Sequence, residues 1–142
     1  MIAWMYQNGE GVLKDHADAV KWYRTAANQG FSKAQYSLGI IYTNGEGVPE
    51  DYVEAVKWYR LAAKQGEVKA QHNLALMYHN GFGVPQDDLW AHMWLTIASG
   101  QGDKSSDEVR GIIAESMTSA DISEAQKMAR ECLNSKYQNC GF

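Results

Sequence analysis

The chain has 142 residues, of which 45% are hydrophobic and 21% charged, and its formal net charge is -4. This length suits one domain with a substantial core. The negative charge argues against nucleic acid as a partner, because phosphate contacts need clustered Lys and Arg. No apolar run approaches the roughly 20 residues of a membrane-spanning helix, and no signal peptide is visible after Met1. We therefore expect no membrane insertion.

A 36-residue internal repeat is the main feature of the sequence. The string Tyr-x-Asn-Gly-x-Gly-Val occurs at residues 6–12, 42–48 and 78–84. The string Ala-Val-Lys-Trp-Tyr-Arg occurs at residues 19–24 and 55–60, and more loosely at 91–96. A Gln-Gly pair closes each unit. Such self-similarity at a fixed period indicates a repeat protein whose units stack on one another.

In chain order, the first unit is cut short, because Met1 aligns with Ser37 of the second unit. We expect the chain to be a fragment of a longer array, with an abbreviated cap as the alternative. The second unit is complete and predicts two helices. Helix A spans residues 32–43 and helix B spans residues 52–65, each with an apolar stripe at helical spacing. The third unit repeats this pair.

The turns and small residues of the second unit support this assignment. Gly45 is expected to end helix A in a left-handed conformation, and Asp51 to cap the start of helix B. Gly39 lies inside helix A at a cost of about 1 kcal/mol relative to alanine. Its counterparts are Ala3 and Ala75. The position must therefore be small, and we expect a neighbouring helix to approach it closely.

The repeat pattern fades after Gly102. Residues 105–117 still predict a helix, residues 118–121 interrupt it, and residues 122–133 predict a final amphipathic helix. We expect residues 1–102 to form the repeats and residues 103–142 to form capping helices and a tail within the same structural domain.

The pattern of the second unit resembles a known family. Residues 34–49 contain Ala-Gln-Tyr-x-Leu-Gly-x-x-Tyr-x-Asn-Gly-x-Gly-Val-Pro, and Trp58-Tyr59, Ala62-Ala63 and Gln65-Gly66 follow. This pattern resembles the Sel-one-like repeat family, a branch of the tetratricopeptide-like helical repeats that is common in bacteria. The resemblance implies an all-α fold, an αα-superhelix or solenoid, that mediates protein–protein contacts.

The predicted function is a non-enzymatic scaffold or adaptor that binds a peptide or protein partner on the concave surface lined by the A helices. We expect acidic residues of the partner to meet Lys33 and Lys69. The candidate residues are those on the free faces of the A helices: Trp4, Gln7, Lys33, Tyr36, Ile40, Thr43, Lys69, His72, Leu76 and His79. We expect a monomer, with a dimer formed through the edge of the stack as the alternative.

Two other functions stay open. One is a cell-wall or beta-lactam-related hydrolase or binder, by analogy with cysteine-rich relatives, although no nucleophile motif such as G-x-S-x-G is present. The other is a purely structural fragment of a longer repeat protein. We expect no catalytic residue, cofactor or metal site. The backbones of His72 and His79 lie roughly 10 Å apart along one helix, which is too far for one zinc ion.

Cys132 and Cys140 are the only cysteines. A disulfide between them would tie the tail to the last helix and contribute roughly 2–3 kcal/mol through loop closure. It would place the protein in the periplasm or outside the cell, whereas two free thiols would fit the cytoplasm. We favour the disulfide.

Overall fold

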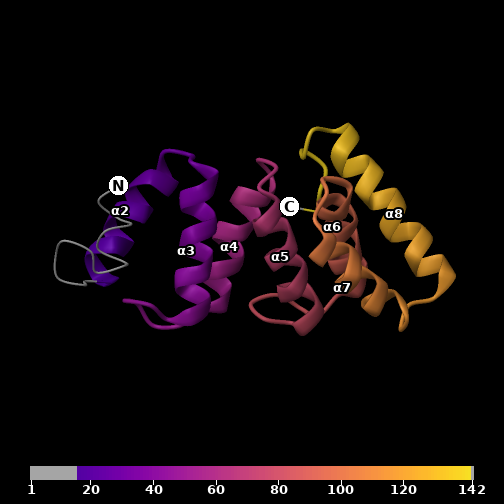
Figure 1. Cartoon of the computed structure of the whole chain (residues 1–142), viewed down its shortest axis with the longest axis horizontal. Coiled ribbons are helices and arrows are strands. Elements are labelled where there is room, and N and C mark those ends of the chain that lie inside the picture. The colour runs from indigo at the N-terminus through magenta and orange to yellow at the C-terminus, as the bar shows by residue number, and fades with distance from the viewer. Residues whose placement is uncertain (1–15, 142) are drawn as a thin grey trace.

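The computed structural model describes residues 16–141, which form helices joined by short turns and contain no strand. The helices follow one another along the long axis of the molecule (Figure 1). In chain order they are α2 (His16–Asn28), α3 (Ser32–Asn44), α4 (Tyr52–Ala63), α5 (Val68–Asn80), α6 (Asp88–Gly100), α7 (Lys104–Ala114) and α8 (Ser119–Asn134). This all-α repeat superhelix confirms the predicted fold class. None of these helices is long and apolar enough to cross a bilayer.

The second and third units each form an antiparallel helix pair, α3 with α4 and α5 with α6. Helix α2 is helix B of the first unit. Successive units are joined by packing of each helix B on the next helix A, that is α2 on α3 and α4 on α5. At the C-terminal end, both α7 and α8 pack on α6.

The helix ends follow from local chemistry. Gly45 ends α3 in a left-handed conformation with φ of 69°, which costs glycine little because it has no Cβ. The Asp51 side chain caps α4 by accepting a hydrogen bond from the Glu54 backbone at 3.1 Å. Thr118 caps α8 in the same way, through the backbone N–H of Asp121. The helix predicted to begin at residue 122 therefore begins at Ser119. The predicted interruption at residues 118–121 consists of the cap and the first turn of this helix.

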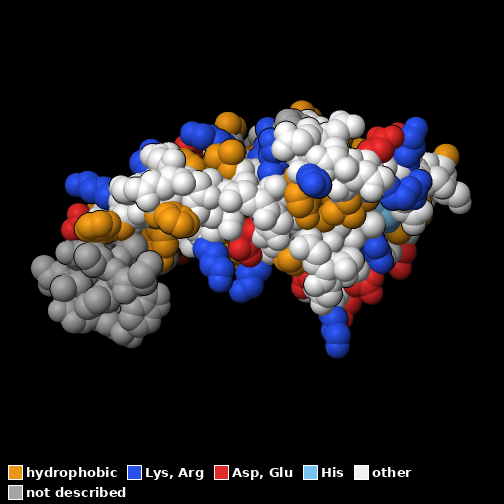
Figure 2. Space-filling view, turned by 90° about the horizontal axis from the view of Figure 1, so that it is seen from above, with side chains coloured by type: hydrophobic (Ala, Val, Ile, Leu, Met, Phe, Trp, Pro, Cys, Tyr) orange, Lys and Arg blue, Asp and Glu red, His pale blue; other side chains and the backbone are white. Residues whose placement is uncertain are grey.

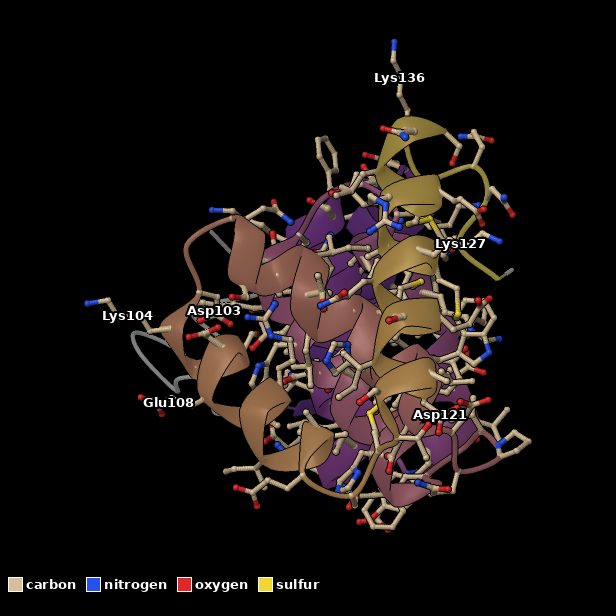
Figure 3. All side chains as sticks on the ribbon, turned by 90° about the vertical axis from the view of Figure 1, so that its right-hand side faces the viewer. Asp103, Lys104, Glu108, Asp121, Lys127 and Lys136 are labelled. Atoms are coloured by element: carbon tan, nitrogen blue, oxygen red, sulfur yellow. A yellow bond between two sulfur atoms is a disulfide. The ribbon has the colours of Figure 1, made fainter. Side chains whose placement is uncertain are left out.

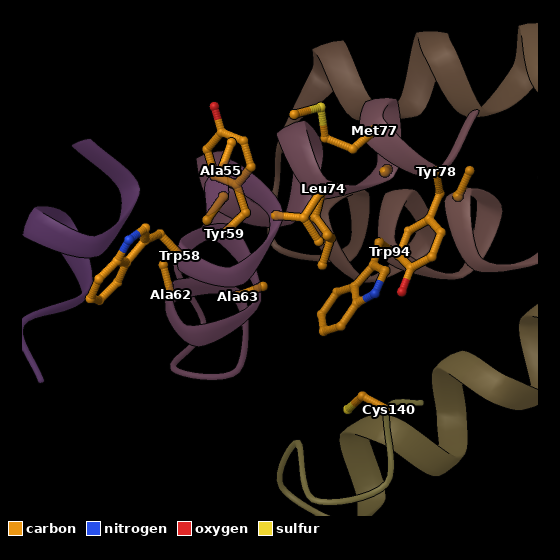
Figure 4. Packing of buried hydrophobic residues seen from close by; sticks show 14 of the residues in the cluster. Ala55, Trp58, Tyr59, Ala62, Ala63, Leu74, Met77, Tyr78, Trp94 and Cys140 are labelled. Carbon is orange, nitrogen blue, oxygen red and sulfur yellow. The ribbon is translucent and has the colours of Figure 1, made fainter. Parts of the chain in front are cut away.

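The predicted buried face of helix B is confirmed. Its members are Ala55, Trp58, Tyr59, Ala62 and Ala63, and none is more than 3% exposed (Figure 4). The small residue of helix A faces this side. A Cβ atom added to Gly39 would lie only 2.3 Å from the Tyr59 ring. The close approach expected at this position is thus a contact with an aromatic side chain of the same unit.

Equivalent residues of successive units occupy equivalent environments. Gln35 and Gln71 are buried, and each donates from its side-chain amide to a backbone carbonyl eight residues earlier, at 3.2 and 3.1 Å. Each also accepts a hydrogen bond from a glutamine thirty residues later, Gln65 and Gln101, at 2.8 and 2.7 Å. These hydrogen bonds satisfy polar groups that would otherwise be costly to bury, and the bonds to the Ala27 and Ala63 carbonyls join each unit to the one before it.

The tryptophans of helix B follow this rule only in part. Trp58 and Trp94 are 3% and 0% exposed, whereas Trp22 is 47% exposed. Trp22 belongs to α2, and no described helix lies on the N-terminal side of α2. Its environment therefore differs from that of its two counterparts.

The C-terminal tail folds back onto the third unit. A disulfide joins Cys132 of α8 to Cys140, and both residues are buried. Within the loop that this bond closes, the Tyr137 ring stacks on Trp94, with centroids 6.5 Å apart. Its hydroxyl accepts a hydrogen bond from the Gln71 side chain at 3.3 Å. The tail thus contacts the buried core of the third unit.

Candidate partner-binding face

Eight of the predicted partner-binding residues lie on α3 and α5, and none of them is fully buried. Lys33 and Lys69 are exposed, and the other six are partly exposed. We call this surface the A-helix face; its members are Lys33, Tyr36, Ile40, Thr43, Lys69, His72, Leu76 and His79. The remaining two predicted residues, Trp4 and Gln7, lie outside the described residues.

An open hollow of about 160 Å³ lies at the centre of this region. Its walls come from α3, α5 and α7 and from the turn before α7. The lining residues are Tyr36, Lys69, His72, Asn73, Asp103 and Ser105. Three of the predicted residues are therefore brought together around one hollow, large enough for a side chain of a bound segment but too small for a folded partner.

Tyr36 is held in place on one wall of the hollow. Its side chain forms a hydrogen bond with Asn73, and its ring lies 6.2 Å from that of Tyr59. Burial raises the pKa of Tyr36, and the negative charge of Glu67 adds to this effect. The phenol therefore stays neutral at physiological pH and offers both an aromatic ring and a hydroxyl group.

His72 connects the hollow to the start of α7. Its Nδ1 atom lies 2.7 Å from the Ser106 hydroxyl, which donates to the Asp103 carboxylate at 2.5 Å. The carboxylate can only accept, so the Ser106 proton points to Asp103 and His72 donates through Nδ1–H. Ser106 is 0% exposed. This chain of hydrogen bonds therefore ties α5 to α7.

The same three residue types form the catalytic triad of serine hydrolases, but their arrangement here is different. In a triad, the serine hydroxyl is exposed and gives its proton to the histidine. Ser106 is buried and gives its proton to Asp103 instead. The cluster is therefore suited to holding two helices together and not to nucleophilic attack.

Thr43 and His79 make contacts within their own units. The Thr43 hydroxyl donates to the Gly39 carbonyl at 2.8 Å and lies 3.1 Å from the Tyr59 hydroxyl. His79 Nδ1 lies 2.8 Å from the Asp88 carboxylate on α6. Both polar groups are thus used to hold helix A against helix B. The hollow is lined by neither of them.

Three residues of the hollow were absent from the predicted set, namely Asn73, Asp103 and Ser105. Asn73 also bonds to Tyr59, as Ser37 bonds to Tyr23 one unit earlier. The 36-residue period places these two polar residues in register, so this signal was present in the sequence. The period also aligns Ser105 with Lys69, but the weaker similarity beyond residue 102 obscured this relation.

The charged side chains of the described surface are mixed in sign. On the side shown in Figure 2, basic and acidic residues are interspersed over the described part of the molecule. Within residues 16–141, no group of three or more His, Cys, Asp or Glu side chains could hold a metal ion.

Comparison with known proteins places these features in a family. The model of the Sel1 repeat matches the chain at residues 1–31, 32–67 and 68–103. No curated protein matches the chain in sequence. Among solved structures, c5321, a protective antigen of uropathogenic Escherichia coli with an SLR fold, is similar, with a TM-score of 0.80 and 36% identity. A Sel1 repeat protein from Oxalobacter formigenes is also similar, with a TM-score of 0.78 and 30% identity.

Both similarities extend over 96% of this chain. The chain spans 28% of the length of the Escherichia coli protein and 63% of the length of the Oxalobacter protein.

Proposed function

Because the chain belongs to the Sel1 repeat family, we propose that it is an interaction scaffold that binds an extended segment of a protein partner on the A-helix face. Sel1 repeat proteins generally act as non-catalytic scaffolds for protein interactions. The observation that carries the proposal is the hollow between α3, α5 and the start of α7, because the second unit, the third unit and α7 all contribute side chains to it that are partly or fully exposed.

The chemistry of this face suits a peptide. Tyr36 supplies a partly buried aromatic ring, and aromatic residues often dominate binding energy at interfaces. Ile40 and Leu76 are partly exposed and add apolar contact area. Lys69 lies at the rim of the hollow and forms no ion pair with any described residue. An acidic side chain of a bound segment would complement it.

A hydrolase is the second candidate, and one observation bears on it. His72, Ser106 and Asp103 are hydrogen-bonded, yet the Ser106 hydroxyl is buried and committed to Asp103. We expect Ser106→Ala to lower stability and to leave peptide binding largely intact. Turnover of a penicillin-like or cell-wall substrate by the purified chain that disappears in this variant would favour the hydrolase.

The scaffold proposal is tested with a Tyr36→Ala/Leu76→Ala double variant. Random nine-residue peptides are displayed and selected on the wild-type chain, and the selected pool is measured on the variant. We expect about a tenfold or greater loss of affinity, because truncating a central aromatic anchor commonly costs more than 1 kcal/mol.

The matched control is Leu61→Ala/Leu133→Ala, which removes two exposed leucines from α4 and α8. This control variant should bind the selected peptides as tightly as the wild type does. Circular dichroism melting checks that both variants fold. If the pool binds the Tyr36→Ala/Leu76→Ala variant and the wild type equally, the A-helix face is not the binding surface.

A further inference from the structure

Helix α7 continues the A-helix face by one more unit. Ser106 of α7 is buried like Ala70, the residue 36 positions earlier, and Ile113 is buried like Met77. These two buried residues keep the register of the repeat, although Asp107, Arg110 and Gly111 stand at the positions of the buried Gln71, Leu74 and Ala75 without being buried. At the position of Lys33 and Lys69, α7 carries Ser105, and at the position of Tyr36 and His72 it carries Glu108. At the position of Ile40 and Leu76 it carries Ile112, and at the position of Thr43 and His79 it carries Glu115.

This register reveals a change of charge along the face. The α3 and α5 end carries Lys33 and Lys69, both exposed. The α7 end carries Glu108 and Glu115, which are also exposed. Among the described residues, none of these four side chains forms an ion pair. By contrast, Asp107 on another side of α7 is paired with a neighbouring arginine at 2.5 Å.

Glu115 has a further reason to attract a cation. It lies at the C-terminal cap of α7, where the helix dipole is negative and a carboxylate is unfavourable. Lys104 precedes Glu108 by one helical turn, but these two side chains form no ion pair. Both side chains extend outward from α7, on the side away from Lys127 of α8 (Figure 3). The acidic end of the face therefore lacks a basic partner within the described residues.

An apolar position lies between the two carboxylates. Ile112 is 65% exposed, whereas Ile40 and Leu76 are partly buried. Residues at i−4 and i+3 share one helical face with residue i, so Glu108 and Glu115 lie on either side of Ile112. An exposed isoleucine flanked by two unpaired carboxylates matches a partner residue that combines an apolar stem with a positive head, as Arg and Lys do.

We propose that the A-helix face selects a bipolar peptide segment, with an acidic side chain over Lys33 and Lys69 and a basic side chain over Ile112, Glu108 and Glu115. This inference rests on the proposed scaffold function and adds the charge order of the ligand. Neighbouring helices lie about 8–10 Å apart, and Ile112 lies about 10 Å further along the helix axis than the lysine row. Since an extended chain advances about 3.3 Å per residue, roughly four to seven residues separate the two charges of the ligand.

Charge reversal of each end tests this order. The peptide selection is repeated on three proteins: the wild type, Lys33→Glu/Lys69→Glu and Glu108→Lys/Glu115→Lys. The wild type should enrich peptides with one acidic and one basic residue at this spacing. The first variant should shift the enriched pool toward purely basic peptides and the second toward purely acidic ones. We expect wild-type bipolar peptides to lose about three- to tenfold in affinity on either variant at low salt.

The control reverses two exposed charges of α8, in Glu124→Lys/Lys127→Glu, and should leave the enriched pool unchanged. If both A-helix variants enrich the same peptides as the wild type, the charge order is wrong. If the Tyr36→Ala/Leu76→Ala variant abolishes binding in that case, the scaffold proposal stands and only the charge order is rejected. If no peptide is enriched on the wild type, or if the Tyr36→Ala/Leu76→Ala variant keeps the pool, the binding face itself is wrong and the charge order falls with it.

Discussion

At the scale of single residues, two positions of the repeat that pack against each other, one on helix A and one on helix B, change size together from one unit to the next. The second unit combines Gly39 with Tyr59, whose ring fills the space where a Cβ would lie. The third unit combines Ala75 with Leu95 at the equivalent positions, and both are 0% exposed. A smaller helix B residue thus accompanies a larger helix A residue, as close packing of a core requires.

This pairing predicts a thermodynamic coupling between the two positions. We expect Gly39→Ala alone to destabilise the chain by about 1–3 kcal/mol through overpacking. In a Tyr59→Leu background, the same change should cost little or stabilise, because alanine favours a helix by about 1 kcal/mol over glycine. Urea unfolding of the double-mutant cycle measures the coupling. Additive effects of the two substitutions would contradict the prediction.

At the scale of helices, α6 differs from α4 in carrying a buried histidine. His92 is 3% exposed and stands where α4 has Val56. Burial lowers the pKa of His92 below its ordinary value of 6.5, and the positive charge of Arg110 on α7 lowers it further. The folded state therefore favours the neutral imidazole, while the unfolded chain binds a proton more readily.

This difference predicts that acid weakens the C-terminal part of the stack. The free energy of unfolding should be fully retained above about pH 6.5 and should decrease as the pH falls below this value. His92→Val introduces the residue that the second unit has at this position, and it should remove part of the decrease in the free energy of unfolding at low pH. Urea unfolding at pH 7.5 and pH 5.0 measures both proteins. An equal loss in the variant and the wild type would exclude His92 as the cause.

At the scale of the whole molecule, stability is expected to spread from unit to unit, because a solenoid has mainly nearest-neighbour contacts. The tail is an exception, since the loop closed by Cys132 and Cys140 places Tyr137 against Trp94 and Gln71 of the third unit. It thus adds contacts to a unit that precedes it by two helices. The disulfide also favours an oxidising compartment, as a proposal for where the protein resides.

Removing the disulfide should therefore weaken the third unit more than the second. We expect Cys132→Ser/Cys140→Ser to lose about 2.5 kcal/mol by the loop-closure argument. Hydrogen exchange should accelerate in α5 and α6 more than in α3 and α4. Treatment with a dithiol should give the same pattern in the wild type and no change in the variant. Uniform acceleration along the chain would argue against a local role of the tail.

The sequence by itself determined the period, the helix pairs and the family, because Gly45, Asp51 and Trp58 recur with the same spacing in the other units and report local chemistry that each unit repeats. The accessible side of the A helices followed from the same period. The division of the chain into repeats at 1–102 and a cap at 103–142 stays a prediction, as do the binding residues.

Only the tertiary structure decided which exposed residues meet. It gathered Tyr36, Lys69 and His72 around one hollow, and it bound Thr43 and His79 to the B helices of their own units. It also showed that Ser106 and Ile113, the two buried residues of α7, keep the register of Ala70 and Met77 although Arg110 has replaced the buried Leu74. The physical reason is that such contacts depend on the distance and angle between helices, and these are set by the packing of all units together.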